Sequence, residues 1–317
     1  MKANGTARQR RPIYVESRIN APIERVWDAT QQPDQHQRWD LRFGTISYLP
    51  RADGEPQRFR YATTVAPGVT VAGTGESLGD RDRPDGTRWS GLKFWAADRR
   101  SIIDAGAGYW RYIPTDDGVR FLTRYDYRPR WGRVGDLIDR WAFRPVFGWA
   151  TAWSFDRLRL WLEDGTPPER TRNQAIAHAI AVGGLAGVFA YQGLVPKVWK
   201  LDGGEVAIWQ GLGLPHRRAT RVVRGVGAVE AAFAVATVAP SNKRWPFVIA
   251  LAAMPTLAIG AAKADRSILT KAFNPASLGL AVASLASVTL ATKEGRPSGL
   301  RPLRRAPDRQ PAVEELP

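Results

Sequence analysis

The feature that most constrains this chain is a set of long stretches without formal charge in its second half. Residues 173–196 form a run of 24 residues without a charged side chain, residues 272–292 a run of 21, and residues 245–262 a run of 18. A helix needs about 20 apolar residues to cross a hydrocarbon core of about 30 Å. Three membrane spans are therefore predicted directly.

A fourth span is expected over roughly residues 219–239, although this segment contains Arg221, Arg224 and Glu230. With an even number of spans, the segments before the first span and after the last span lie on the same side of the membrane. The tail that begins at Lys293 is rich in arginine, which favours the cytoplasm by the positive-inside tendency. We therefore predict a multi-pass protein of a bacterial inner (plasma) membrane, with its amino-terminal part and its tail in the cytoplasm.

The first half of the chain has a different composition, because residues 1–168 hold ten of the thirteen tryptophans. The basic amino terminus is followed by the strand-like IYVESRI instead of the apolar core of a secretory signal. Gly165 and the following Pro167-Pro168 mark a helix stop and a stiff joint. The predicted organisation is a flexible amino terminus over 1–11, a soluble domain over 12–168, a membrane domain over 169–292 and a disordered Pro/Arg-rich tail over 293–317.

The soluble domain is predicted to be α+β. Short alternating segments separated by turn signals predict a meandering antiparallel sheet. Residues 135–163 then carry apolar side chains near helical spacing and predict a long helix, kinked at Pro145. The segments expected to form strands are IYVESRI, TISYLP, RFRYATTV, VTVAGTGESL, RWSGLKFWAA, GYWRYIP and VRFLTRYDYR.

Residues 12–164 resemble the START-related, polyketide-cyclase-like (SRPBCC) superfamily. The resemblance rests on the order of a strand, a helix with Ala21-Pro22 and Val26-Trp27, the segment Arg38-Trp39-Asp40, a meander and a terminal helix ending in FDRLRLWLEDG. It implies a helix-grip fold, in which a curved antiparallel sheet wraps the long helix. It also implies an apolar cavity for a lipid, a polyketide or another hydrophobic ligand.

Residues 173–292 look like the DoxX-like family of four-helix membrane proteins, which implies an all-α transmembrane bundle. The resemblance rests on landmarks in the order of that family. These are Tyr191 to Lys197, Gly211 to Pro215, Gly227 with Glu230, Arg244-Trp245-Pro246 and Phe273-Asn274-Pro275.

Aromatic residues of the first domain are the candidates for a ligand cavity, because such cavities are walled by rings with a few polar groups. Each ring taken singly is more often ordinary core. The group as a whole exceeds what a small compact core requires. The candidates are Trp39, Phe59, Tyr61, Trp89, Trp110, Phe121, Tyr125, Trp141 and Trp153.

Glu230 is the most conspicuous candidate in the membrane domain, because a carboxylate in a span is costly unless it is paired or faces a polar path. Arg224 lies six positions away on the same helix, which is poor spacing for a pair. A partner on another span is therefore expected. The polar candidates are His178, Gln192, Lys197 and Arg224, and the alternatives are a packing clamp or a transport, proton or ligand site.

Composition excludes several kinds of chemistry. The chain has no cysteine, so disulfides, thiolate metal sites and cysteine nucleophiles are excluded, and its three histidines are far apart in sequence. No metal, no cofactor and no catalytic residue is predicted, although Glu76, Asp126 and His36 are considered as acids or bases. The net charge of +16 gathers beside the spans and in the tail, which points to anionic lipid and not to nucleic acid.

Two functions remain open from sequence, with membrane lipid and a small hydrophobic ligand as the expected partners. The first is a membrane-anchored carrier for a lipid, isoprenoid or quinone-like molecule. The second is a cyclase, dehydratase or hydrolase acting on an aromatic or polyketide-like substrate in the same cavity. Converging titratable groups in the cavity would favour the enzyme, and a purely apolar lining would favour the carrier. A third option is that the membrane bundle is the active part.

Overall fold

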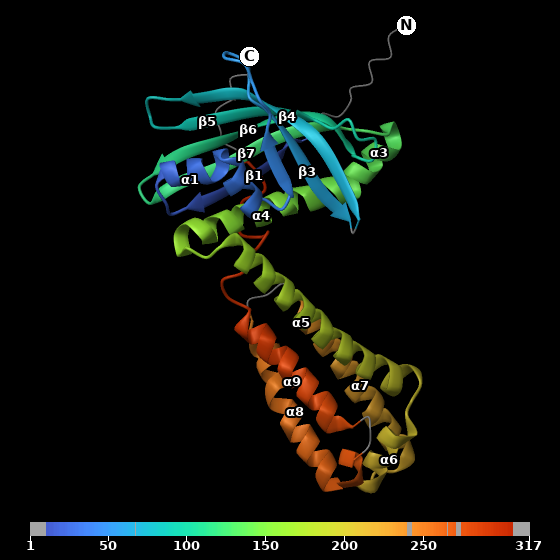
Figure 1. The fold of residues 1–317 in the computed structure, drawn as a ribbon. Helices are drawn as coiled ribbons and strands as arrows, with labels where there is room; N and C mark the ends of the chain where they lie inside the picture. The colour runs from blue at the N-terminus through green and yellow to red at the C-terminus, as the bar shows by residue number, and fades with distance from the viewer. Residues whose placement is uncertain (1–10, 67, 240–242, 265, 271–273, 307–317) are drawn as a thin grey trace. The chain divides into compact units, whose positions relative to one another are not determined.

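A computed structural model describes residues 11–66, 68–239, 243–264, 266–270 and 274–306 of the chain (Figure 1). The chain divides into two compact units. The sheet unit comprises residues 1–172 and 297–317, and the helical unit comprises residues 173–296.

The sheet unit is built on seven antiparallel strands in the order β1-β7-β6-β5-β4-β3-β2. Apart from β1, each strand pairs with its neighbour in sequence, so the sheet is the predicted meander, and β1 closes on β7. The strands are β1 (Ile13–Ile19), β2 (Thr45–Tyr48), β3 (Arg58–Ala66), β4 (Val69–Asp82), β5 (Arg88–Trp95), β6 (Ile103–Thr115) and β7 (Gly118–Pro129).

Helices cover one face of this sheet. Two short helices, α1 (Ile23–Gln31) and α2 (Pro33–Trp39), follow β1, and the long terminal helix comprises α3 (Gly132–Ile138), the π-helical η1 (Asp139–Phe143) and α4 (Arg144–Asp164). The π-helical segment ends two residues before Pro145, whose missing N–H cannot complete the preceding turn. Phe155 and Leu158 of α4 are fully buried against the sheet. An antiparallel sheet against a long helix is the architecture of the helix-grip fold.

The described part of the tail differs from the predicted disorder. Glu16 of β1 and Leu303 exchange two backbone hydrogen bonds of 2.9 and 2.8 Å. The N–H of Ser298 donates to the buried carboxylate of Asp156 at 2.7 Å. Composition did not reveal this because the partner of the tail is the open backbone edge of β1, which any sequence can pair with. Residues 307–317 of the predicted tail lie outside the described residues.

The helical unit is all-α. Its helices are α5 (Pro168–Leu194), followed by the π-helical η2 (Val195–Trp199), then α6 (Gly203–Gly211), α7 (His216–Val238), α8 (Trp245–Ala264), the short η3 (Arg266–Thr270) and α9 (Pro275–Ala291). The four long helices α5, α7, α8 and α9 correspond to the four predicted spans. A small core around Leu185, Phe247 and Val282 joins α5, α8 and α9.

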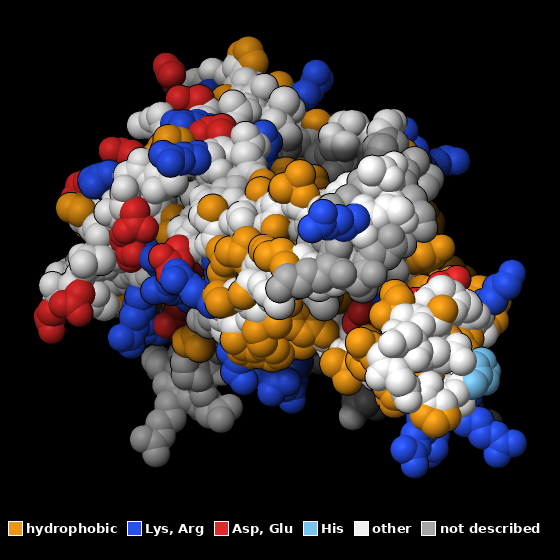
Figure 2. Space-filling model, turned by 90° about the horizontal axis from the view of Figure 1, so that it is seen from below, with side chains coloured by type: hydrophobic (Ala, Val, Ile, Leu, Met, Phe, Trp, Pro, Cys, Tyr) orange, Lys and Arg blue, Asp and Glu red, His pale blue; other side chains and the backbone are white. Residues whose placement is uncertain are grey.

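Among the residues that the structure describes, the helix from Pro168 to Trp199 is the one long and apolar enough to cross a membrane. Two apolar segments, Trp245–Thr256 and Pro275–Ala291, are shorter. Large apolar side chains are exposed on the outside of this unit, such as Ile180, Val235 and Leu280 at 67 to 71%. Figure 2 shows apolar side chains gathered into broad patches on the face that it presents, with Lys and Arg around them.

Candidate functional site

The interior of the sheet unit is made of aromatic rings that lie between the sheet and α4. Trp39 of α2, Trp110 of β6 and Phe121 of β7 are all buried. The ring centroid of Phe155 of α4 lies 6.1 Å from that of Trp39 and 4.5 Å from that of Phe121. Trp110 lies 6.2 Å from Trp39, and Tyr125 belongs to the same core. Four of the nine predicted aromatic residues therefore meet in one cluster.

Two further candidates, Phe59 and Tyr61 of β3, lie on the same face of the sheet. Phe59 is aligned through Gly75 of β4 with Phe94 of β5, and Phe94 is aligned through Gly106 of β6 with Tyr127 of the core. All of these residues therefore lie on one face of the sheet. The ring centroids of Phe59 and Tyr61 are 6.4 Å apart, and both side chains are half-buried. They extend the aromatic wall toward the far edge of the sheet.

The other three aromatic candidates lie outside this cluster and its extension along β3. Trp89 lies on the opposite face from Trp110, because its neighbour in β5 is the cross-strand partner of Trp110. Trp141 is 71% exposed on η1. Trp153 is buried on α4 but stacks on Trp149 outside the aromatic cluster. Residue type alone does not say which face of a strand or side of a helix a ring occupies.

A buried polar cluster adjoins the aromatic rings. The side chain of Asp40, just after α2, has no exposed surface. Its carboxylate accepts hydrogen bonds from the guanidinium of Arg42 at 2.6 and 2.9 Å and lies 3.0 Å from Nε2 of His36. The guanidinium of Arg42 lies 5.6 Å from the ring of Tyr125, inside the core. The sequence analysis did not select Asp40 and Arg42 as site residues. The pattern that could have indicated them is an acidic and a basic residue on either side of Leu41 in the segment RWDLR.

Electrostatics keep this cluster ionised at Asp40 and Arg42. Burial alone would raise the pKa of Asp40, but the charge of Arg42 and the bonds from Arg42 and His36 together hold that pKa well below its usual range. Burial also opposes the charge on Arg42, yet Asp40 keeps the pKa of Arg42 above its ordinary value. The pair is therefore a fixed dipole inside an apolar interior.

His36 is enclosed by rings, with its centroid 5.1 Å from Trp39, 5.1 Å from Phe43 and 4.9 Å from Trp110. Burial lowers the pKa of His36 below its ordinary value of 6.5 and outweighs the bond to Asp40. The imidazole is therefore neutral near pH 7. Because the carboxylate of Asp40 can only accept, Nε2 carries the proton and Nδ1 keeps a lone pair.

The other two acid or base candidates are engaged elsewhere. Glu76 pairs with Arg58 at 2.8 Å and with Lys93 at 2.7 Å, on the sheet face that points away from the aromatic cluster. Asp126 pairs with Arg144 at 3.0 Å. Over the described ranges, no group of three or more His, Asp or Glu is placed to hold a metal ion.

An exposed apolar surface on the terminal helix was also missed. Val134, Leu137, Ile138 and Trp141 are 42 to 71% exposed and form what we call the α3 face. Their spacing of three, one and three residues places them on one side of a helix. The helical spacing of these apolar residues is visible in the sequence. It does not show whether the apolar side of the helix is buried in the core or exposed.

In the helical unit, Glu230 of α7 has the partner on another segment that the sequence led us to expect. The ammonium of Lys197 in η2 lies 2.9 and 3.2 Å from the two carboxylate oxygens of Glu230. It also lies 3.3 Å from the carboxylate of Glu205 in α6. Lys197 is buried, so one cation joins three segments of the chain.

Two glycines bring these segments close enough for the pair to form. A Cβ on Gly193 would lie 2.6 Å from the carbonyl oxygen of Gly227, and a Cβ on Gly227 would lie 2.7 Å from Cβ of Lys197. Both distances are shorter than real Cβ contacts, so only glycine fits. The two glycines at the crossing of α5 and α7 therefore let the helices approach closely enough for Lys197 to contact Glu230.

Of the remaining polar candidates of this unit, Gln192 reaches the site of Glu230 only through its backbone, whose carbonyl lies 3.4 Å from the ammonium of Lys197. Arg224 and His178 do not contribute to that site. Arg224 is exposed on α7. His178 bonds to the hydroxyl of Thr292 at 3.0 Å, near the end of α9. Sequence spacing could not separate these residues because the ends of the helices meet only in three dimensions.

Comparison with known proteins supports a membrane protein. Residues 186–287 match the DoxX-like family. The chain is 42% identical over 186 residues to the uncharacterized membrane protein YndG of Bacillus subtilis, a match that covers 58% of this chain and 69% of that protein. The matched stretch is longer than the stretch from Met1 to Arg172, so it includes residues of both units.

Solved structures resemble the sheet unit only remotely. A STAR-related lipid transfer protein fragment from Xanthomonas axonopodis has 17% identity and a TM-score of 0.37, with 47% of this chain and 84% of that chain covered. The Zhui aromatase/cyclase from Streptomyces sp. R1128 has 14% identity and a TM-score of 0.33, with 47% and 96% covered. The helix-grip assignment rests on the strand order of the sheet and on α4.

We predict that His36 makes the sheet unit sensitive to mild acid. The folded protein binds fewer protons at His36 than the unfolded chain does, so stability is full above pH 6.5 and falls as the pH drops below it, by at most about 1.4 kcal/mol per pH unit. The depressed pKa of Asp40 acts in the same direction only below its ordinary value of 3.8. Melting of the full chain in detergent, followed by tryptophan fluorescence from pH 7.5 to 5, should show this slope.

The variant His36→Gln should flatten that pH dependence, whatever its effect on stability at pH 7.5. The matched control is His216→Gln, which changes an exposed histidine at the start of α7 and should leave the slope unchanged. Parallel slopes for the parent and His36→Gln would contradict a buried neutral imidazole.

We predict that Lys197 matters more to the helical unit than Glu230 does. Lys197→Met leaves two neighbouring carboxylates without their cation. These side chains are 25 and 33% exposed, so the cost should be about 2 kcal/mol, less than for a fully buried pair. Glu230→Gln leaves Lys197 paired with Glu205, so its melting temperature in detergent should stay near that of the parent. Glu230→Leu should lie between the two, and Arg224→Gln is the exposed control. A parent-like Lys197→Met would show that the packing does not depend on this pair.

Proposed function

The chain belongs to the family of the Bacillus subtilis membrane protein YndG, and on this premise we propose that it is a membrane-anchored carrier for a hydrophobic ligand held in the helix-grip domain. The observation that carries the proposal is the composition of the interior, where rings enclose a compact polar cluster. A lipid, isoprenoid or quinone-like molecule has the same division into a large apolar body and a small polar head. Rings would contact the body, and His36, Arg42 and Tyr125 would face the head.

The α3 face supports the proposal from outside the domain. Four exposed apolar side chains on one helical side are unusual on a surface that meets only water. Arg133 is exposed beside them, and the guanidinium of Arg140 lies 5.4 Å from the ring of Trp141. Apolar residues flanked by arginines are typical of helices that lie in the headgroup region of a bilayer. We therefore take the lipid surface as the partner of this face and as the source or destination of the ligand.

Converging titratable groups beside the rings favour a second function, an enzyme acting on a hydrophobic substrate. His36 is neutral, is oriented by the ionised Asp40, and keeps a lone pair on Nδ1. An imidazole held in this way is a competent general base if a substrate proton lies within about 3 Å of it. The two functions differ in the fate of the ligand, because an enzyme changes the covalent structure of the molecule that it holds, and a dehydratase or hydrolase also changes its mass.

We predict that the purified full-length protein retains a hydrophobic molecule that depends on the aromatic interior. Native mass spectrometry and solvent extraction of the protein in lipid nanodiscs would detect it. Trp110→Leu removes ring surface from the interior and should weaken retention about tenfold, the effect of losing about 1.4 kcal/mol of apolar contact. An altered mass after incubation with the extracted molecule would indicate the enzyme.

The matched control for this experiment is Trp89→Leu, which removes the same side chain from the opposite face of the sheet and should leave retention unchanged. Equal retention by the parent and Trp110→Leu, or a parent that neither carries nor takes up an apolar molecule, would contradict the carrier.

We also propose that α5, α7, α8 and α9 each cross the membrane once. The start of α5 and the end of α9 lie together, since the side-chain amide of Gln174 bonds to the carbonyl of Thr292 at 3.4 Å. Four crossings then leave both flanks on one side. Lys243, Arg244 and Arg296 lie at this same end, which supports a cytoplasmic location.

This arrangement predicts that reporters fused after Gly165 and after Ser298 are both active in the cytoplasm. A reporter that functions only after export, fused at the same two positions, should be silent, and fusion between α5 and α6 should reverse both results. Reporters at Gly165 and Ser298 that respond on opposite sides of the membrane would show an odd number of crossings.

A further inference from the structure

The chain leaves the helical unit after Arg296 and ends in the sheet unit, and we call residues 297–306 of this end the strap. The strap pairs with β1, because Leu303 and Glu16 exchange two backbone hydrogen bonds of 2.9 and 2.8 Å. β1 is an outer strand of the sheet, so its other side is paired only with β7. The strap therefore covers part of an edge that would otherwise be open.

The strap also runs along α4. The N–H of Ser298 donates to the carboxylate of Asp156 at 2.7 Å, and the guanidinium of Arg304 donates to the carbonyl of Pro145 at 3.1 Å. Pro145 lies at the start of α4 and Asp156 lies past its middle. The strap therefore joins the long helix to the edge strand.

The strap is held by backbone contacts and not by large buried side chains. A Cβ on Gly299 would lie 2.5 Å from two ring atoms of Trp149, so the backbone lies directly on the indole. Leu300 and Leu303 are 74 and 55% exposed, and the buried residues of the strap are two prolines and Gly299. A segment that buries so little apolar surface opens at a lower free energy than the core does.

A hollow of about 570 Å³ adjoins the strap and shows that the packing there is loose. Arg301 and Leu303 line it together with the end of β1, the turn between β6 and β7 and the last part of α4. Its lining includes charged side chains such as Arg18, Asp116 and Glu163. A polar space of this size admits water, which competes for the backbone bonds of the strap.

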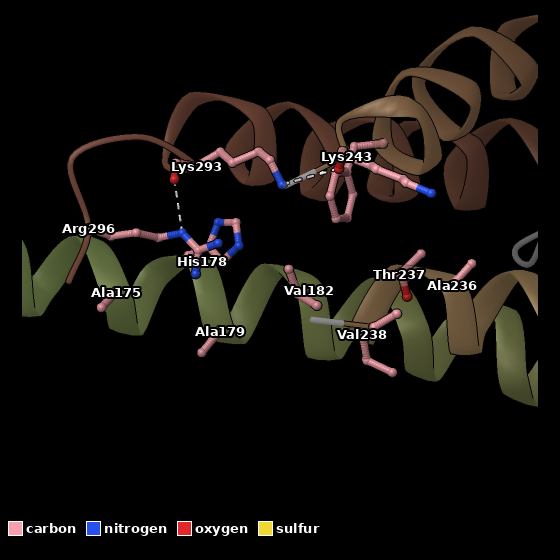
Figure 3. Close-up of a pocket in the computed structure, with 12 residues that line it drawn as sticks. Ala175, His178, Ala179, Val182, Ala236, Thr237, Val238, Lys243, Lys293 and Arg296 are labelled. Atoms are coloured by element: carbon pink, nitrogen blue, oxygen red, sulfur yellow. Dashed lines mark hydrogen bonds between the residues drawn. The ribbon is translucent and has the colours of Figure 1, made fainter. Parts of the chain in front are cut away.

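The segment just before the strap is anchored in the helical unit. Nε of Arg296 donates to the carbonyl of Lys293 at 3.0 Å (Figure 3). From α5, the side-chain amide of Gln174 donates to the carbonyl of Thr292 at 3.4 Å and to the carbonyl of Glu294. The end of α9 therefore determines where the strap begins.

The two anchored segments are adjacent in sequence. Only Pro297 separates Arg296 from Ser298, and the ring of proline fixes its backbone angle φ. A displacement of Arg296 therefore also moves Ser298, whose N–H bonds to Asp156 of α4.

We propose that the strap is a releasable closure of the sheet unit, kept in place by the end of α9. When the strap is in place, α4 is fixed to β1 and the aromatic interior is shut. When the strap is released, α4 is held to the sheet only by its inner side, with Phe155 and Leu158, and the interior opens. That this interior holds a ligand rests on the proposed function, whereas the closure itself does not.

The test measures amide hydrogen exchange by mass spectrometry in the full chain in phosphatidylcholine nanodiscs. Leu303→Pro removes the N–H that bonds to Glu16 and alters an exposed side chain, and Leu303→Ala is the matched control that keeps this N–H. Losing the pairing should make the amides of α4 exchange about tenfold faster in Leu303→Pro and leave them parent-like in Leu303→Ala.

A second variant protects the test against a folding defect. Gly299→Val pushes the strap off Trp149 and should give the same faster exchange in α4. The amides of β3, β4 and β5 should keep the exchange of the parent in both variants, which shows that the sheet is still folded. Parent-like exchange of α4 in both Leu303→Pro and Gly299→Val would overturn the closure.

The role of the helical unit is tested at Gln174. Gln174→Leu removes both bonds from α5 to the segment before the strap and should make the amides of α4 exchange about threefold faster. Asn173→Leu changes the exposed neighbour on the same helix and should have no effect. Equal exchange of α4 in these two variants would show that the end of α9 does not keep the strap in place.

Release of the retained hydrophobic molecule is measured separately. Leu303→Pro should release it faster than Leu303→Ala does. Equal release from the two variants, with faster exchange of α4 in Leu303→Pro, would show that the strap does not control the interior. A parent that retains no such molecule would contradict the carrier, and the exchange measurements would still decide whether the strap is a closure.

Discussion

A charge removed from water must meet an opposite charge, and this requirement decides which residues come together in both units. In the sheet unit, Asp40 is fully buried and is held by Arg42 and His36. In the helical unit, Lys197 is buried and joins Glu205 and Glu230. Each pair fixes the segment that carries it, because separating the partners would leave an uncompensated charge in an apolar environment. Packing around these pairs then follows.

Backbone geometry determines whether such a pair can form. Lys197 reaches Glu230 because Gly193 and Gly227 let two helices approach more closely than any side chain would allow. In the sheet unit, the turn after α2 has the comparable effect. It directs the side chains of Asp40 and Arg42 into the interior, where they can pair. The charged residues therefore select the fold only where local geometry already brings their backbones together.

Local pattern was enough to predict the strands and the long helices, but it missed the short helices α2 and α6 and did not predict what the elements contact. Alternation and turn residues gave the strands of the meander, and charge-free runs gave the long helices of the second half. The same information could not place Trp89 and Trp110 on opposite faces, because it does not fix where each strand turns. It also missed the pairing of Leu303 with Glu16, which depends on an open strand edge and not on side chains.

The family resemblances predicted an element that local pattern left ambiguous. The landmark residues of the second half predicted α7 despite Arg221, Arg224 and Glu230, where hydropathy alone was ambiguous. The resemblance did not predict Asp40 with Arg42, because a buried ion pair is a property of one domain's packing. Nor did it separate His178 from Glu230, since both are polar residues in predicted spans. Partners had to be read from the three-dimensional arrangement.

The α3 face is an exception to the inward packing of apolar side chains. Its four large apolar side chains are 42 to 71% exposed, and no described segment covers them. Such a surface is costly in water, so contact with an external apolar phase would lower the free energy of the domain. A lipid bilayer would supply that phase, and it is the same solvent that long apolar helices need.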